Sequence, residues 1–276
     1  MYGITNSWIY DITIALYALS VLGYFIDFLQ NNRKANVIAF WLLSIVWVLQ
    51  TISLLLTLLE FNRFPFFTIF EGLFLYVWLI VTLSLVINWF FTVDFFVFFA
   101  NVFGFIIMSI HLFAPKDNVS TAVTEQLMSE LLIIHISMAM LSYGAFALAF
   151  IFSIMYLFQH NLLKKKKWGK RLVRLGNLSQ LESLSYSSTI IAVPMLALSL
   201  VLGIIWAYIK VEAFHWYDAK VLLSFIVLIV YSIYLFLKVG KGLHGKALSM
   251  WNIAGFLVIL INLFLSGELS SFHLWE

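Results

Sequence analysis

Long, uninterrupted apolar stretches limit what this chain can fold into more than any other feature. Eight of them can be drawn along the sequence, at residues 9–29, 37–59, 68–91, 93–113, 131–158, 187–209, 219–239 and 248–267. A helix of about 20 apolar residues crosses the hydrocarbon core of a membrane and satisfies its own backbone hydrogen bonds there. The alternating pattern of β-barrel strands is missing. The sequence therefore predicts an all-α integral membrane protein, a polytopic bundle of eight transmembrane helices that forms one domain over residues 1–276.

The composition agrees with a membrane location. Hydrophobic residues make up 63% of the chain and charged residues 11%, whereas soluble domains carry about 25% charged residues. Residues 1–8 lack the basic start of a signal peptide, so we expect the first span to be retained. The chain has no cysteine, which excludes disulfides, thiolate ligands and thiol relays.

Lysine and arginine are distributed unequally between the two predicted sides of the membrane. Of the 16 basic residues, all but Arg63, Lys116, Lys210 and Lys220 fall in or beside loops on the side that holds neither terminus. Basic loops mark the cytoplasmic side. The sequence therefore predicts a bacterial plasma-membrane protein whose N- and C-termini are both extracytoplasmic. This topology depends on the tight connection near residues 92–94.

The predicted cytoplasmic loop 160–186 holds the densest basic run, Lys164–Lys167. The run is first of all a topology signal, and it also offers a dock for a cytoplasmic protein. Apolar and basic residues alternate over 171–175, which favours an amphipathic turn on the anionic inner leaflet. Nucleic-acid binding is not expected, because the run is short and lacks a recognition fold.

Histidines gather on the predicted outer side, which holds His111, His135, His215 and His273. The remaining two, His160 and His244, fall on the cytoplasmic side. A neutral imidazole offers a nitrogen lone pair near pH 7, and histidine is a common axial ligand of haem iron. His135 and His273 are the favoured pair, although spacing alone leaves open which two of the four would bind.

Aromatic and cationic residues surround the predicted outer turn AFHWYDAKVLL, residues 213–223. Flat walls for a haem could come from Trp206, Tyr208, Trp216 and Tyr217, and cations for its propionates from Lys210 and Lys220. The alternative is an interfacial belt, because tryptophan and tyrosine commonly end membrane spans. For any single residue the belt is the more frequent explanation.

Three acidic residues, Asp11, Asp27 and Glu71, fall in or near the predicted spans. Ionisable groups in lipid are costly, so each is a functional candidate. All three lie close to a predicted span end, where water is reachable, and we expect ordinary interfacial positions for them.

Four segments occur in an order that resembles a known family. They are HISMAMLSYGAFAL from His135, LESLSYSSTIIAVPML (181–196), GIIWAYIKVEAFHWYDAKVLLSF (203–225) and INLFLSGELSSFH, which ends at His273. The third is similar to a tryptophan-rich WWD segment, with Gly203, Trp206, Ala207, Trp216, Asp218 and Lys220 in matching places. Together the segments, mainly over 130–276, resemble the haem-handling CcsA/CcmC/CcmF family of cytochrome c assembly.

The resemblance implies a non-covalently bound haem b. It implies His135 and His273 as iron ligands, and a surrounding platform of Trp206, Lys210, His215, Trp216, Tyr217, Asp218 and Lys220. Two positions depart from the cytochrome-assembling members. His215 stands where they have an aromatic or small polar residue, and Phe236, in YLFLK, stands where they carry a third histidine inside a span. The second departure argues against haem delivery across the membrane.

These departures are typical of the branch of the family that is encoded beside haem-biosynthesis genes in Gram-positive bacteria. That resemblance implies a non-enzymatic regulator that lowers the level of glutamyl-tRNA reductase, with loop 160–186 as the surface that meets the reductase. Two alternatives remain open. One is a haem-handling or haem-transport component of cytochrome c assembly, and the other is a membrane scaffold whose aromatic turn is only an interfacial belt.

Overall fold

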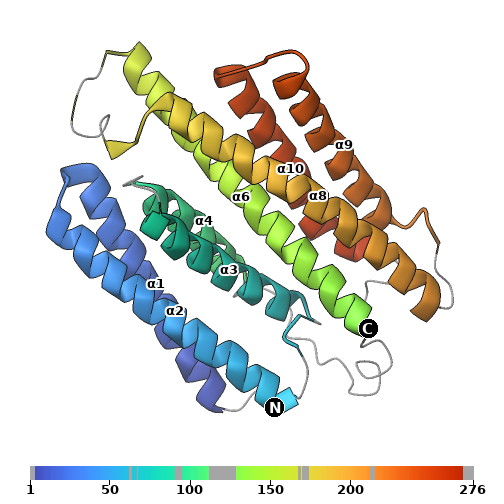
Figure 1. Cartoon of the computed structure of the whole chain (residues 1–276). Coiled ribbons are helices and arrows are strands. Elements are labelled where there is room, and N and C mark those ends of the chain that lie inside the picture. The colour runs from blue at the N-terminus through green and yellow to red at the C-terminus, as the bar shows by residue number, and fades with distance from the viewer. Residues whose placement is uncertain are drawn as a thin grey trace. The chain divides into compact units, whose positions relative to one another are not determined.

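All the regular secondary structure that a computed structural model describes in the protein is α-helical (Figure 1). The described residues are 4–61, 64–66, 68–90, 95–111, 129–166, 169, 174–211 and 215–269. Within them lie eight α-helices and no strand, so the predicted all-α class is confirmed. Seven of these helices are long and apolar enough to cross a membrane. The connection near residues 92–94 lies outside the described residues.

The helices follow the predicted spans in order. They are α1 (Ile4–Gln30), α2 (Arg33–Phe61), α3 (Ile69–Phe90), α4 (Phe96–His111), α6 (Glu130–Lys164), α8 (Leu178–Lys210), α9 (Ala219–Val239) and α10 (Lys246–Leu269). The helix that falls short of a full span is α4, whose 16 residues rise only about 24 Å.

The chain divides into two compact units. Unit 1 consists of Met1–Asn118 together with Trp168–Gly176, and unit 2 consists of Val119–Lys167 and Asn177–Glu276. Unit 1 thus contains α1 to α4, and unit 2 contains α6, α8, α9 and α10.

Small and polar residues hold the helices of unit 1 together. Gly23 of α1 lies directly against Ala39 of α2, because a methyl group at Gly23 would come within 3.0 Å of the Ala39 Cβ. The Tyr17 hydroxyl donates to the Asn101 amide oxygen on α4 over 3.0 Å, and the Asn101 amide nitrogen donates to Ser84 Oγ on α3 over 3.1 Å. These polar contacts lie where no water competes, and they fix three helices in one register.

A buried ion pair in unit 1 corrects two of the sequence interpretations. Asp27 is 1% exposed, and Arg174 donates to its two oxygens over 2.9 and 2.7 Å. The Asp27 carboxylate therefore does not have the ordinary interfacial position that we expected. Arg174 is 10% exposed and Leu175 is fully buried, so this part of the expected amphipathic turn packs into unit 1. Residues 171–173 lie outside the described part of the chain.

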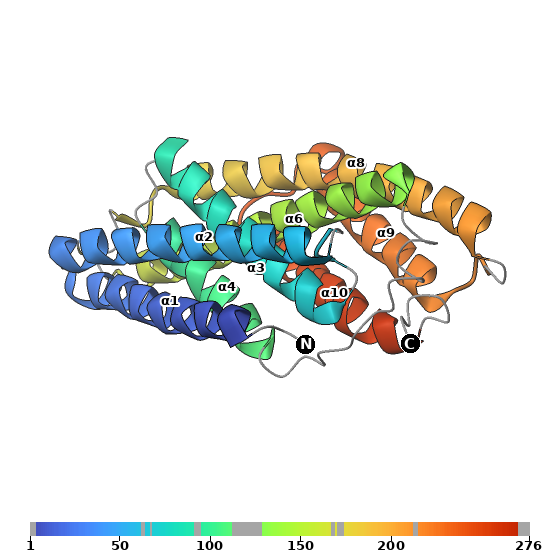
Figure 2. The ribbon, with the colours of Figure 1, turned by 90° about the horizontal axis from the view of Figure 1, so that it is seen from below.

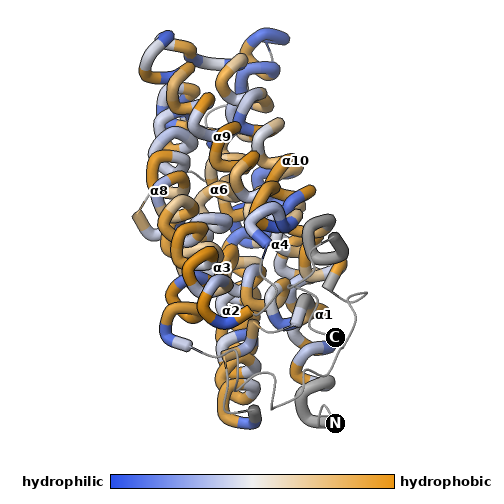
Figure 3. Tube along the Cα trace, turned by 90° about the vertical axis from the view of Figure 1, so that its right-hand side faces the viewer, coloured by the Kyte–Doolittle hydropathy of each residue, from blue (hydrophilic) through white to orange (hydrophobic). Residues whose placement is uncertain are grey.

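Two long antiparallel helices, α6 and α8, form the centre of unit 2, and α9 and α10 pack beside them (Figures 1 and 2). With 35 and 33 residues, α6 and α8 extend about 50 Å, well beyond the hydrocarbon core. The sequence interpretation of residues 160–186 as one loop is therefore wrong: α6 continues to Lys164 and α8 begins at Leu178. The middle of each helix is mainly apolar (Figure 3).

Polar residues nevertheless line the interior of unit 2. The Asn252 amide nitrogen donates to Ser185 Oγ and Thr189 Oγ1, each over 3.2 Å, and Ser153 Oγ lies 3.0 Å from Ser185 Oγ. Where α8 begins, Glu182 pairs with Lys238 of α9. We call this the Glu182 end of unit 2, and the opposite end, which holds His135, the His135 end.

Candidate functional site

The predicted site residues that the structure describes all belong to unit 2. His135 is on α6, Trp206 and Lys210 are on α8, His215, Trp216, Tyr217 and Asp218 precede α9, and Lys220 is in its first turn. His273 lies outside the described residues, as does the side chain of His111. The predicted pairing of His135 with His273 therefore stays a prediction.

His135 lies in the second turn of α6 and contacts Ser199 of α8 through three pairs of atoms. Its Nδ1 lies 2.6 Å from the Ser199 carbonyl oxygen and 3.1 Å from the Ser199 hydroxyl. That hydroxyl donates in turn to the His135 carbonyl over 2.9 Å. The start of α6 is fixed by Ser129, whose side chain accepts from the Leu132 amide over 3.2 Å.

The carbonyl contact decides which nitrogen of His135 carries the proton. A carbonyl oxygen can only accept, so Nδ1 must be the donor, and a neutral imidazole then leaves Nε2 as a bare acceptor. The Nε2 atom makes no hydrogen bond to any residue in the described part of the chain. A metal-binding histidine usually has this arrangement, with one nitrogen donating to an oxygen and the other directed at the metal.

The aromatic residues of the site differ in where they lie. Trp206 is buried at 5% exposure, one turn beyond Gly203 on α8. Trp216 and Tyr217 are 72% and 57% exposed, and their ring centres lie 5.9 Å apart. His215 is also exposed and lies 5.0 Å from Tyr217, ring centre to ring centre. Trp206 thus lies inside unit 2, while His215, Trp216 and Tyr217 form a surface cluster.

Asp218 acts on the backbone of α9. It is the residue that caps the helix N-terminus, where its side chain accepts from the Lys220 amide over 2.8 Å, and it is 6% exposed. Such a cap satisfies one of the free amides at a helix start. The carboxylate thus shapes the turn that carries Trp216 and Tyr217.

The two predicted cations have different surroundings. Lys210 is exposed in the last turn of α8. Lys220 extends into unit 2, where its Nζ lies 3.4 Å from the Asn262 carbonyl oxygen and within electrostatic range of His135. The Asn262 amide nitrogen donates to the Tyr143 hydroxyl over 3.2 Å and to Ser224 Oγ over 3.3 Å. Lys220 therefore begins a polar cluster that connects α9, α10 and α6.

Sequence reasoning missed Ser199, the partner of His135, and three members of this cluster. Ser199, Tyr143, Ser224 and Asn262 are single polar residues in apolar spans. Their hydrogen-bond partners lie 38 to 119 residues away in the sequence. Tyr143 was within the quoted motif that begins at His135, which was the available signal. No group of three or more histidine, cysteine, aspartate or glutamate side chains suited to a metal ion occurs among the described residues.

Phe236 stands where the resemblance predicts that cytochrome-assembling family members carry a third histidine. Its side chain points away from the interior of unit 2. It is 61% exposed, whereas Tyr231 and Tyr234 on the same helix are 0% and 1% exposed. The two tyrosines therefore belong to the inward face of α9, and Phe236 belongs to its exposed face.

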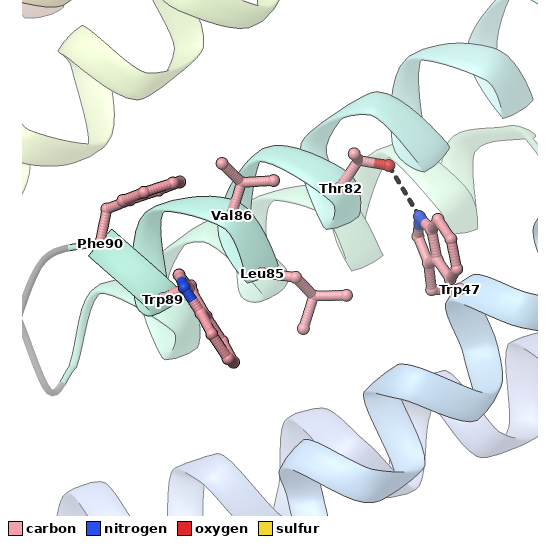
Figure 4. Close-up of a pocket in the computed structure, with 6 residues that line it drawn as sticks. All are labelled: Trp47, Thr82, Leu85, Val86, Trp89 and Phe90. Carbon is pink, nitrogen blue, oxygen red and sulfur yellow. Dashed lines mark hydrogen bonds between the residues drawn. The ribbon is translucent and has the colours of Figure 1, made fainter.

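A separate apolar hollow of about 310 Å³ lies in unit 1 between α2 and α3 (Figure 4). It is lined by Trp47, Thr82, Leu85, Val86, Trp89 and Phe90. The Trp47 indole nitrogen donates to Thr82 Oγ1 over 2.8 Å across one side of it. The hollow has no titratable group, and we assign no chemistry to it.

The seven long apolar helices define the class of the protein, a multi-pass membrane protein, and similarity to known proteins gives its family. The family model for Cytochrome C assembly protein matches residues 66–273, and the chain belongs to this family. The predicted family is therefore confirmed.

Within the family the chain is similar to HemX proteins over nearly its whole length. Protein HemX of Bacillus subtilis (strain 168) is 57% identical over 261 residues, which cover 95% of each chain. Protein HemX of Brevibacillus brevis is 47% identical over 97% of this chain and 98% of its own. Cytochrome c biogenesis protein CcsA of Prochlorococcus marinus (strain MIT 9301) is 26% identical over 83% and 81%.

Proposed function

We propose that this protein is a non-enzymatic, haem-binding regulator of haem biosynthesis. A single observation carries the haem-binding part: His135 is held with Nδ1 as the donor, which leaves Nε2 free to bind iron. The regulatory part, a lower level of glutamyl-tRNA reductase, is what the family resemblance implies, and the similarity to HemX proteins over nearly the whole chain supports it.

The residues at the His135 end fit a haem group chemically. His135 would supply one axial nitrogen and His273 a second, Trp206 offers an apolar ring, and Lys220 offers a positive charge for a propionate. His215, Trp216 and Tyr217 would cover an exposed edge, with Lys210 as a further cation and Asp218 holding their turn. Haem b would supply an iron centre whose occupancy reports haem supply, while the protein residues hold and orient it.

The orientation completes this proposal. In the bacterial plasma membrane, extracytoplasmic termini would place the His135 end outside and the Glu182 end in the cytoplasm, in agreement with the basic residues of the connection between α6 and α8. Lys164, Lys165 and Lys166 in that connection would meet the reductase as a positively charged surface.

An absorbance titration of the purified protein with haem tests the binding. We expect saturable binding with a bis-histidine spectrum in the wild type, and loss of that spectrum in His135→Ala and in His273→Ala. His160→Ala is the matched control, because His160 lies near the other end of α6, and it should bind haem as the wild type does. An unchanged spectrum in His135→Ala would contradict the ligand assignment. No saturable binding at all would favour the alternative of a membrane scaffold whose aromatic turn is only an interfacial belt.

A second candidate is a haem-handling component of cytochrome c assembly, which the similarity to CcsA proteins over most of the chain favours. Deletion of the gene separates the two. A raised level of glutamyl-tRNA reductase with normal c-type cytochromes supports the regulator. Loss of covalently bound haem from c-type cytochromes, with an unchanged reductase level, would support the second candidate instead.

A further inference from the structure

We propose that Ser199 and Gly203 are the positioning residues of His135, and that together they make Nε2 the ligand nitrogen. The proposal rests on the proposed haem site for the identity of the ligand. The orientation of the ring is a property of the free protein and can be tested without haem.

Ser199 presents two oxygen atoms to one ring nitrogen. The carbonyl oxygen is 2.6 Å from Nδ1 and the hydroxyl oxygen 3.1 Å from it. The hydroxyl hydrogen is directed at the His135 carbonyl, which lies 2.9 Å away, so a lone pair of the same hydroxyl faces the ring. A bare Nδ1 would bring three acceptors together in a partly buried place, whereas a protonated Nδ1 satisfies both oxygens.

Gly203, one turn further along α8, allows the ring to lie against the helix backbone. A Cβ at this position would come within 2.5 Å of His135 Cε1, 2.7 Å of Nδ1 and 3.1 Å of Nε2. These three atoms form one edge of the imidazole, and this edge lies close to the glycine. Any larger residue must displace the ring, and Nδ1 of His135 would then lose the Ser199 carbonyl as its acceptor.

Residues four apart share one face of a helix, so Ser199 and Gly203 form a single seat on α8. The seat fixes both the tautomer and the plane of the ring. An oxygen acceptor on the second nitrogen also raises the basicity of the ligating one, and loss of such a partner typically weakens metal binding about 10–100-fold. We therefore expect Gly203→Ala to weaken haem binding within that range.

The direct test is nitrogen NMR of the haem-free protein labelled with ¹⁵N-histidine, with His135→Ala used to assign the signals. The expected result is a protonated Nδ1 and an unprotonated Nε2 on His135. Ser199→Ala removes the hydroxyl but keeps the carbonyl, so the protonated Nδ1 signal should persist. Gly203→Ala should abolish or split it. A protonated Nε2 in the wild type, or an unchanged signal in Gly203→Ala, would overturn the proposal.

Two further comparisons make the result specific. Gly255→Ala is the matched control, because its added methyl would meet Tyr231 of α9 at 3.1 Å and would test the general effect of crowding on unit 2. Its His135 signals should stay as in the wild type. If the expected tautomer is found but haem does not bind, the seat is correct and the proposed function fails. If haem binds through His135 while the tautomer is reversed, the seat is wrong and the function stands.

Discussion

Removal of one partner of the Asp27–Arg174 pair should destabilise the protein strongly. Arg174 donates two hydrogen bonds to the carboxylate, Asn36 donates a third over 2.8 Å, and the guanidinium lies 4.4 Å from the centre of the Phe95 ring. In Asp27→Ala this cation keeps its buried position and loses the carboxylate that accepts its two hydrogen bonds. Breaking a buried pair in this way costs about 3–5 kcal/mol.

The double variant Asp27→Ala, Arg174→Ala tests the cause of that loss. It removes both charges, so it leaves no unpaired charge in the interior. We therefore expect it to cost less than the two single variants added together, with a coupling free energy near 3 kcal/mol, the upper end of the range of about 0.5–3 kcal/mol for residues in contact. Asp11→Ala is the control, because Asp11 is exposed on the same helix and such changes stay within about 0.5 kcal/mol.

The measurement is the free energy of unfolding in mixed micelles, with the wild type and the four variants titrated side by side. The reasoning is refuted if the losses of unfolding free energy in the two single variants simply add in the double variant. It is also refuted if Asp27→Ala loses no more unfolding free energy than Asp11→Ala. Either result would mean that water reaches the carboxylate in the folded protein.

The same measurement checks three smaller changes. Gly104→Ala should cost about 1–3 kcal/mol as an overpacking change, because its methyl would lie 2.4 Å from the Tyr17 hydroxyl. Asp218→Ala should cost about 0.5–2 kcal/mol as a lost helix cap, and Asp218→Asn should restore most of it; equal losses would show that capping is not the role of the side chain. Trp47→Phe should cost about 0.5–1.5 kcal/mol for its hydrogen bond to Thr82, and no loss would mean that this hydrogen bond does not stabilise the fold.

Hydropathy predicted the helical class and the order of the spans, but the ends of the helices needed other signals. The sequence interpretation began span six at residue 187, whereas α8 begins at Leu178. Asn177 accepts from the Gln180 amide over 2.6 Å, and an Asn followed three residues later by Gln is a start signal for a helix. This capping pattern can be recognised in the sequence, but the spans were placed by the length of the apolar runs alone.

In the candidate site, the sequence predicted the residues that lie in recognisable motifs and missed their partners. The motifs brought out His135 and Trp206, because both lie in stretches with a recognisable order. Ser199 has no such mark, since one serine in an apolar span has many possible roles and its contact with His135 joins residues 64 apart. The Arg174 contact with Asp27 joins residues 147 apart. Such pairings depend on how helices pack, and local patterns do not encode them.

Two helices give unit 2 a physical link between its ends. At the His135 end α8 carries Ser199 and α9 carries Lys220, and at the opposite end the same helices carry Glu182 and Lys238, which form an ion pair. Seventeen residues of α8 separate Ser199 from Glu182, a rise of about 25 Å. Packed helices move between discrete arrangements, and α8 and α9 each contribute a residue to both ends of unit 2. Under the proposed function, a change at His135 therefore has a direct route to the Glu182–Lys238 contact.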